Sequence, residues 1–380
     1  MAARKKIVFP YYNNYYTSTA IIIYQTNIIK TLNLLQDNKK PHLYIWHNHH
    51  SPLNEIKAIN YPYINFINIK SFNFRIYKLM SAICDKLGLS KFILFNTDYD
   101  SIYPAYHDNF LNGIKRRIYW KADFQENYYP QYFVQEEINW VKDFFNHLKK
   151  DASSPLVLSS NDAFHDYNKF YPNVKNPVLL FRFISHVAEN LDFSKLNDIK
   201  QKFNITKPYF IVCNQYWPHK NHIVVLKALH QLKQNGILNF QFVFTGKTSS
   251  IRGNNYFKEL QQYILENNLH NDIVITDFVD RENQLILMKK AIAIVQPTTF
   301  EGWSTVIEDG KALNQYVVAS NIAVNIEQIE DNVSFFNPQD SNQLAEIIQQ
   351  ISSNYPKIVA TKYNKNIEAS IQDLIAIFEL

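Results

Sequence analysis

The stretch YFIVCNQYWPHKNHIVVLKALHQLKQNG, residues 209–236, indicates a β-strand, a loop and an α-helix in succession. The apolar run Tyr209–Cys213 predicts a buried strand, and the polar run Asn214–Asn221 predicts a loop. From His222 onward apolar residues recur at helical spacing, with Asn221 as a candidate N-cap and Gly236 just past the helix end. This is one strand–helix unit of a doubly wound fold.

The same alternation runs through the rest of the chain. In the second half, strands are predicted at 241–245, 273–276, 291–296, 316–319 and 333–336, and helices at 256–267, 282–290, 306–313 and 341–352. In the first half, strands are predicted at 7–10, 43–46, 91–95, 117–120, 156–159 and 178–181, and helices at 19–35, 75–86, 136–149 and 162–170. Such alternation implies parallel sheets covered by helices on both faces.

A chain of 380 residues exceeds what one compact core usually holds, so two domains are expected. The polar stretch 194–207 predicts their boundary, which gives a first Rossmann-like domain at 1–195 and a second at 196–355. Residues 356–380 form a last helix whose apolar face is expected to cross to the first domain. Ligands of such sheets bind at the carboxyl ends of the strands, so a central cleft between the domains is predicted.

Charge and cysteine content bear on compartment and partners. The net charge is +5, with 24 basic against 17 acidic residues in 1–200 and 15 against 17 in 201–380. The clusters Arg4-Lys5-Lys6 and Lys115-Arg116-Arg117 fit either a surface for an anionic partner or a merely solvated surface. No apolar run reaches the ~18 residues of a membrane span, and no signal peptide is evident. Cys84 and Cys213 lie in apolar segments and predict free thiols in a reducing compartment, the cytoplasm.

The stretch PTTFEGWSTVIEDGKAL, residues 297–313, carries the most chemistry. It leads from a buried strand into a helix, whose first amides and dipole favour a phosphate. Gly302 allows close approach of the backbone to a ligand. Glu301 can hydrogen-bond sugar hydroxyls and Glu308 can hold a ribose diol, although Thr305 and Glu308 also have the spacing of a capping box.

Several motifs together resemble those of the retaining glycosyltransferases of family 4, in the branch with the EGWST motif that acts on bacterial surface polysaccharides. They are EGWSTVIEDG (301–310), NQYWPHKNH (214–222), WKADFQ (120–125) and LSSNDAFHDYNKFYP (158–172), and the likeness covers about residues 115–350. It implies the α/β GT-B fold. The family's second glutamate usually stands eight positions after the first, whereas Glu301 and Glu308 are seven apart.

The resemblance implies roles for individual residues. Lys220 would neutralise the donor diphosphate, Glu301 would bind the donor sugar, and Asp123 and Gln125 would face the reacting carbon and the acceptor. The other implied donor-binding residues are Glu308, Gly302, Trp303, Ser304, Thr305, Gln215, Gly246, Lys247 and Phe278. Gln215 stands where the family usually has an arginine, so Lys247 or Arg252 would supply a second cation. Glu126 replaces a histidine common in the branch.

Metal is not expected. His47-Asn48-His49-His50 has the look of a metal cluster, and two of its histidines would share a face if the strand continued, but no acidic or cysteine partner is evident nearby. Asp98-Tyr99-Asp100 has the spacing of a metal-binding pair but is interpreted as a loop of the first domain.

The sequence thus predicts a cytoplasmic retaining glycosyltransferase with a UDP- or GDP-linked sugar as co-substrate and no cofactor. Its acceptor would be a glycan, lipid-linked, in O-antigen, capsule or similar polysaccharide synthesis. A peripheral contact with the inner membrane is expected and nucleic acid is not. Two alternatives stay open: a sugar-nucleotide epimerase on the same fold, and a non-catalytic subunit that binds sugar nucleotides or glycans.

Overall fold

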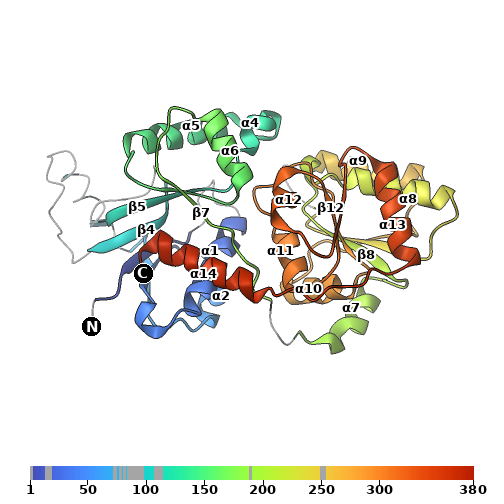
Figure 1. Ribbon diagram of the computed structural model, residues 1–380, viewed down its shortest axis with the longest axis horizontal. Helices are drawn as coiled ribbons and strands as arrows, with labels where there is room; N and C mark the ends of the chain where they lie inside the picture. The colour runs from blue at the N-terminus through green and yellow to red at the C-terminus, as the bar shows by residue number, and fades with distance from the viewer. Residues whose placement is uncertain are drawn as a thin grey trace. The chain divides into compact units, whose positions relative to one another are not determined.

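The computed structural model describes residues 3–12, 19–71, 98–106, 114–187, 191–248 and 254–380, together with residues 75, 76, 79 and 83. The chain divides into two compact units. Unit 1 comprises residues 1–184 and 364–380, and unit 2 comprises residues 185–363. Each unit is a parallel sheet with helices on both faces (Figure 1), so the predicted fold class is confirmed.

Unit 1 is built on a seven-stranded sheet in the order β3-β2-β1-β4-β5-β6-β7. Its strands are β1 (Lys6–Pro10), β2 (His42–His47), β3 (Ile64–Asn68), β4 (Tyr99–Ala105), β5 (Ile114–Lys121), β6 (Leu156–Leu158) and β7 (Val178–Leu180). Its helices are α1 (Thr19–Asn33), α2 (Leu53–Ala58), α4 (Gln125–Tyr128), α5 (Gln135–Lys150), α6 (Asn161–Phe170) and α14 (Asn364–Phe378). The predicted strand 91–95 and most of the predicted helix 75–86 lie outside the described residues.

Successive residues of a strand in unit 1 contribute their side chains to two separate cores, because side chains alternate between the faces of a strand. Ile7 and Phe9 belong to the core beneath α1, α2 and α14. Val8, between them, belongs to the core beneath α5 and α6. Figure 1 shows these helix groups on opposite faces of the sheet. Burial on both faces explains why β1 and β6 are almost continuous apolar runs.

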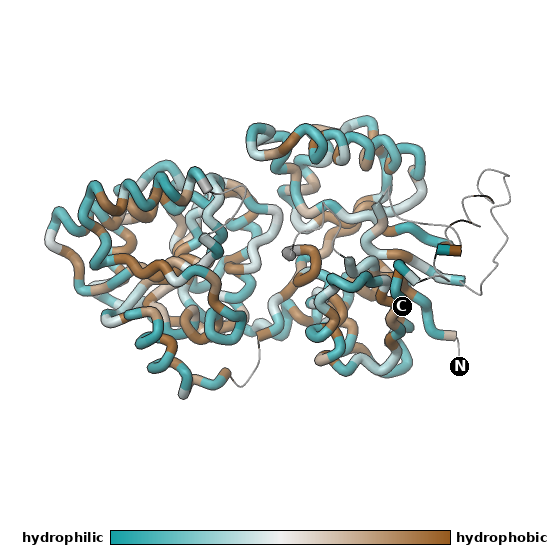
Figure 2. The backbone as a smooth tube through the Cα atoms, turned by 180° about the vertical axis from the view of Figure 1, so that it is seen from behind, coloured by the Kyte–Doolittle hydropathy of each residue, from teal (hydrophilic) through white to brown (hydrophobic). Residues whose placement is uncertain are grey.

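Unit 2 has a six-stranded sheet in the order β10-β9-β8-β11-β12-β13. Its strands are β8 (Tyr209–Cys213), β9 (Gln241–Thr245), β10 (Ile273–Ile275), β11 (Ile294–Gln296), β12 (Val317–Ser320) and β13 (Val333–Phe336). Its helices are α7 (Leu196–Lys202), α8 (His222–Gln234), α9 (Asn254–Glu266), α10 (Arg281–Lys290), α11 (Thr305–Ala312), α12 (Ala323–Gln328) and α13 (Ser341–Ser353). In Figure 2 segments of apolar residues, coloured brown, run through the interior of this unit.

Unit 2 extends at both ends beyond residues 196–355, the range predicted for the second domain. Ser185 is buried, and its hydroxyl donates to Asp309 of α11. At the other end, the side chain of Asn332 exchanges hydrogen bonds of 2.8 Å with the backbone of Val359, and the hydroxyl of Tyr363 reaches Glu308. Hydrogen bonds therefore hold both ends of unit 2 to its own helices and loops.

In each sheet the strand order reverses beside the first strand, between β1 and β4 and between β8 and β11. Loops that leave the carboxyl ends of strands at such a switch point diverge, which leaves room for a ligand. In unit 2 these are residues 214–221 and residues 297–304. Both loops were singled out by the sequence.

Candidate functional site

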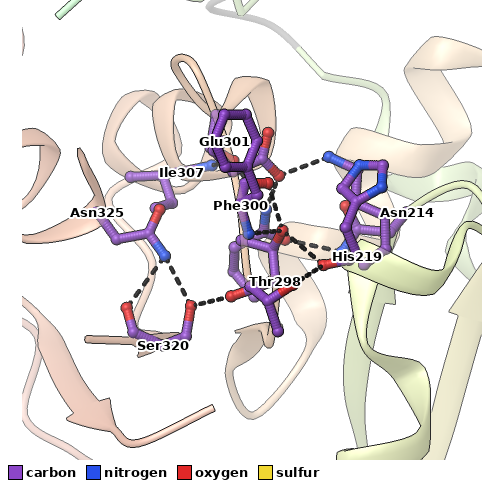
Figure 3. Close-up of polar contacts among 12 residues, drawn as sticks. Asn214, His219, Thr298, Phe300, Glu301, Ile307, Ser320 and Asn325 are labelled. Carbon is purple, nitrogen blue, oxygen red and sulfur yellow. Dashed lines mark hydrogen bonds and ion pairs between the residues drawn. The ribbon is translucent and has the colours of Figure 1, made fainter. Parts of the chain in front are cut away.

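The two loops at the switch point of unit 2, residues 214–221 and 297–304, are hydrogen-bonded to one another. The backbone amide of Thr299 donates to the carbonyl of His219 at 2.8 Å. The hydroxyl of Thr298 donates to the same carbonyl at 3.0 Å. Figure 3 shows Thr298 beside His219, with the dashed contacts that link the loops. The sheet edge therefore presents one continuous surface.

Asn221 adds a further link between the loops. It lies in the left-handed region (φ 54°), which asparagine tolerates better than most residues. It is the N-cap residue of α8, as predicted, but its side chain makes no hydrogen bond to the start of the helix. Instead its Nδ2 donates to the carbonyls of Pro297 (3.0 Å) and Pro338 (2.8 Å).

Lys220 and Glu301, the residues to which the sequence assigns the chemistry, meet at this edge. The Nζ atom of Lys220 lies 2.5 Å from Oε1 of Glu301. The side chains are 15% and 11% exposed, so little water screens the ion pair. The site therefore holds a cation and a carboxylate side by side, both within reach of a ligand.

Two histidines, His219 in the first loop and His222 at the start of α8, are neutral. Burial, with a smaller contribution from the nearby Lys220 ammonium, lowers the pKa of His219 to about 2 and that of His222 to about 3. His219 therefore contributes its backbone carbonyl to the joint between the loops, and not a charge.

Helix α11 begins at the end of the second loop. Its N-cap is Ser304, whose hydroxyl oxygen accepts from the amide of Ile307 at 3.4 Å. The amide of Ser304 donates to Oε1 of Gln328 at 2.9 Å. Because the cap lies one residue earlier than Thr305, the capping box proposed for Thr305 and Glu308 is not formed, and that interpretation is wrong.

The carboxylate of Glu308 is enclosed by protein donors, and the residue is 1% exposed. Its Oε1 accepts from Lys311 (2.7 Å) and Gln328 (3.1 Å), and its Oε2 accepts from the hydroxyl of Tyr363 (2.7 Å). Burial and then this carboxylate raise the pKa of the Tyr363 phenol. The resemblance implies that Glu308 binds the ribose, but the ribose hydroxyls would have to compete with these three donors for its carboxylate.

Asp309 was missed by the sequence reasoning. It stands eight positions after Glu301, the spacing usual in the resembled family, and this count was the signal that could have found it. It is 2% exposed, receives both terminal nitrogens of Arg281 and accepts from the hydroxyl of Ser185. Two adjacent carboxylates of α11 are thus both paired inside unit 2.

Residues after β9 and β10 border the same edge. A Cβ atom at Gly246 would lie 2.2 Å from the carbonyl oxygen of Asn214, so only glycine fits there. The Nζ atom of Lys247 lies 5.5 Å from the ring centre of Phe278, which is 65% exposed. A solvent-facing aromatic ring with a cation at its face offers a stacking surface.

The other residues predicted to bind the donor differ in exposure. Gly302 and Trp303 are buried, Thr305 is half-buried and Gln215 is exposed. Arg252 lies outside the described residues, so of the two cations proposed to replace the missing arginine only Lys247 is placed.

In unit 1, Asp123 and Gln125 lie in the turn that follows β5. The Oδ1 atom of Asp123 accepts from the amide of Gln125 at 3.0 Å and so opens α4. The Nζ atom of Lys121 lies 3.0 Å from Oε1 of Glu126 and donates to the carbonyl of Asp123. This ion pair fixes the turn, which gives Glu126 a structural partner in place of a role at the ligand.

The sequence Asp98-Tyr99-Asp100 is not the loop that was expected, since Tyr99 and Asp100 begin β4. The apolar residues of β4 are buried in the sheet, which overrides the local polarity. Lys115 on the neighbouring strand β5 lies 3.0 Å from Asp98 and 3.2 Å from Asp100. Both carboxylates are therefore satisfied by an ammonium group.

The cluster His47–His50 does not form a shared face, because β2 ends at His47 and a turn follows. The His49 and His50 rings lie 3.9 Å apart. Across the described ranges of the chain, no group of three or more His, Cys, Asp or Glu side chains is placed to hold a metal ion.

Four members of the two basic clusters of unit 1, Arg4, Lys115, Arg116 and Arg117, are paired with acids. Arg4 lies 2.8 Å from Asp37, and Arg117 lies 3.4 Å from Asp151. The guanidinium of Arg116 donates to a backbone carbonyl at the end of α14. These contacts favour the solvated-surface interpretation of the charge over a free anion-binding patch.

The chain is similar to known proteins in sequence and in fold. Residues 194–370 match the family model described as Glycosyl transferases group 1. The two parallel-sheet units are those of the GT-B fold. The chain is also 26% identical over 231 residues to the O-antigen chain mannosyltransferase RfbU of Salmonella typhimurium. That alignment covers 60% of this chain and 59% of the relative, so the chain matches less than two thirds of the relative's length.

Solved structures share the fold over nearly the whole chain. Anabaena Alr3699/HepE, in complex with UDP and glucose, gives a TM-score of 0.66 at 14% identity and covers 99% of this chain and 98% of its own. A glycosyltransferase from Rickettsia africae gives 0.64 at 18% identity, with 99% and 94% covered. WaaG, a glycosyltransferase involved in lipopolysaccharide biosynthesis, gives 0.59 at 11% identity, with 98% and 95% covered. At such identities the likeness concerns the fold alone.

Proposed function

We propose that the protein is a retaining glycosyltransferase of family 4. It would move a sugar from a UDP- or GDP-linked donor to a glycan acceptor in polysaccharide synthesis. The observation that carries the proposal is the Lys220–Glu301 pair at the switch point of unit 2, inside the segment that matches the group 1 model. A fixed cation suits a departing diphosphate, and a fixed carboxylate suits the hydroxyls of the donor sugar.

The reaction follows from these residues. The bond between the anomeric carbon and the diphosphate oxygen breaks, and the acceptor oxygen bonds to the same face of that carbon. The proton of the acceptor hydroxyl passes to the leaving diphosphate. Lys220 stabilises the negative charge that develops there. Glu301 orients the sugar, with Asp123 and Gln125 assigned to the acceptor side, and no metal or other cofactor enters a step.

The acceptor of the reaction and its place in the cell are proposed as well. The similar protein from Salmonella is described as an O-antigen chain mannosyltransferase, which supports a lipid-linked glycan as acceptor. Such an acceptor would place the enzyme at the cytoplasmic face of the inner membrane. Within the residues that the structure describes, no helix is long and apolar enough to cross a membrane.

The test combines a donor panel with three variants. UDP- and GDP-sugars are screened by thermal shift, since the best ligand raises the melting temperature most, and transfer to a polysaccharide precursor is then measured. Lys220→Ala and Glu301→Ala should each lower kcat by about 100-fold or more. Lys233→Ala is the matched control, because Lys233 also pairs with a carboxylate of unit 2, Asp272 at 2.9 Å, but on α8 away from the loops.

The outcomes separate the alternatives. NMR of the product shows whether the anomeric configuration is retained. Conversion of the donor without acceptor would indicate an epimerase. Donor binding without turnover would indicate a non-catalytic subunit. Unchanged turnover in both the Lys220 and Glu301 variants would overturn the assignment of this site.

A further inference from the structure

Gln296 is a polar residue in the centre of unit 2. It is the last residue of β11 and is 0% exposed. A buried amide destabilises the fold if its hydrogen bonds are not made. All the hydrogen bonds of the Gln296 side chain go to the loops that form the site, and none serves the strand itself.

The direction of the Gln296 amide follows from its partners. Its Nε2 donates to Oε1 of Glu301 at 2.9 Å and to the hydroxyl of Ser304 at 3.0 Å. Its Oε1 accepts from Nδ2 of Asn214 at 2.8 Å. With the amide turned over, its oxygen would face a carboxylate and its NH2 group would face another NH2 group. Only one orientation therefore satisfies the three partners.

This contact decides how Glu301 presents its carboxylate. Both Lys220 and Gln296 donate to the same oxygen, Oε1. Among the described residues, no protein group donates to Oε2 of Glu301. One oxygen is thus held by the protein from two sides, and the other is left to accept from a ligand.

We propose that Gln296 is a positioning residue of the donor site. Its amide holds the Glu301 carboxylate in the orientation that offers Oε2 to the hydroxyls of the donor sugar. Through Ser304 it also holds the cap that opens α11. The inference rests on the proposed function of the site, in which Glu301 binds the donor sugar.

Two substitutions at this position test the role in the full-length chain. Gln296→Leu keeps the size of the side chain and removes all three hydrogen bonds, so kcat for transfer should fall by about 10- to 100-fold. In Gln296→Glu two carboxylates face one another and must share a proton. Its activity should therefore recover as the pH is lowered, relative to the wild type measured at the same pH.

Two controls separate positioning from a structural role. Gln315 is also a buried glutamine of unit 2, and its Nε2 donates to the carbonyls of Met288 (3.1 Å) and Ala291 (2.9 Å), away from the loops. Gln315→Leu should lower the melting temperature without changing kcat per folded molecule. If Gln296 acts through Glu301, adding Gln296→Leu to Glu301→Gln should cause little further loss.

Three results would overturn the inference. They are wild-type kcat and KM in Gln296→Leu, fully additive losses in the double variant, and a Gln296→Glu enzyme whose pH profile matches that of the wild type. If the wild type is active and any of these results is obtained, only the role of Gln296 is refuted. A wild type that transfers sugar from no nucleotide donor refutes the proposed function and this inference together.

Discussion

Two neighbouring carboxylates in α11, Glu308 and Asp309, show how local context decides what an acidic residue does. Both are buried, but each is paired with its own protein partners, Glu308 with Lys311 and Tyr363, and Asp309 with Arg281. A buried carboxylate that loses a partner, or a partner that loses its carboxylate, costs far more than a surface pair. We therefore expect Glu308 to contribute chiefly to stability.

Glu308→Ala should lower the free energy of unfolding of unit 2 by about 3 kcal/mol, because Lys311 and the Tyr363 hydroxyl lose their acceptor. Tyr363→Phe should cost about 2 kcal/mol, since it removes the hydrogen bond to that carboxylate and the one that the hydroxyl accepts from the amide of Ser185. Denaturant unfolding measures both. If Glu308→Ala instead leaves stability unchanged and raises KM for the donor, its main role is at the ribose.

The buried histidines predict a pH dependence of stability. The folded-state pKa of His222, about 3, lies below the ordinary 6.5, so below about pH 6.5 the unfolded chain takes up a proton that the folded unit does not. Stability is present above that pH and is lost as the pH falls, by about 1.4 kcal/mol per pH unit for each such histidine.

In His222→Phe the loss of stability on acidification should be smaller by the contribution of one histidine. Phe suits this position, which lies between the rings of Tyr216 and Phe244. The free energy of unfolding of unit 2, measured between about pH 6.5 and 4, gives the slope of stability against pH for the variant and the wild type. Equal slopes in the variant and the wild type would show that His222 is protonated in the folded state.

The sequence predicted the charged residues of the candidate site but not the residues that position them. Lys220 and Glu301 could be found because each follows a strongly apolar strand and is a charged residue in a loop. Gln296 could not, because a single polar residue at the end of a strand has no pattern, and its role depends on Asn214 and Glu301, which are distant in the sequence.

At the scale of elements, asparagine adopts the left-handed backbone conformation at positions where glycine is the usual residue. The chain has only seven glycines, and six of the described residues with positive φ are asparagines. The ends of α8 and α9 illustrate the exchange. Gly236 (φ 73°) and Asn268 (φ 55°) both follow the helix, and the next residue donates back to the last turn, Ile237 to Leu232 and Leu269 to Ile264.

Asn268→Ala should destabilise unit 2 by about 1 kcal/mol, because alanine pays the full steric cost of the left-handed region. Asn268→Gly should be neutral or slightly stabilising. The thermal unfolding midpoints of the two variants measure the difference. Equal midpoints would show that the backbone of Asn268 leaves the left-handed region when the residue is replaced.

Elements with weak local signals were missed. β4, YDSIYPA, contains Asp, Ser and Pro, and becomes a strand because its apolar residues are buried between β1 and β5. β3 mixes Ile and Phe with Asn at the sheet edge, and α12 has six residues, too few to show a helical period. Burial of β4 and α12, and the pairing of β3 with β2, fixed these elements, and the local sequence displays neither.

For the molecule as a whole, the chain ends in the unit in which it began. α14 follows unit 2 in sequence, yet Leu374, Ile377 and Phe378 belong to a core cluster whose other members all lie in unit 1. The last residues therefore complete a core that the first residues begin. The stability of unit 1 depends on a segment that is synthesised after unit 2.

Phe378→Ala tests this dependence. Phe378 is 3% exposed, and its ring centre lies 6.0 Å from that of Phe9 and 5.6 Å from that of Tyr103, both edge-on. Loss of a buried aromatic side chain costs about 3–5 kcal/mol. Hydrogen exchange should therefore speed up in peptides from β1 and β4, while peptides from β8 and β11 keep their protection. Gln372→Ala, on the exposed side of the same helix, is the control and should change neither set. Equal loss of protection in both units would mean that they unfold as one cooperative body, and that α14 stabilises more than the core in which its side chains lie.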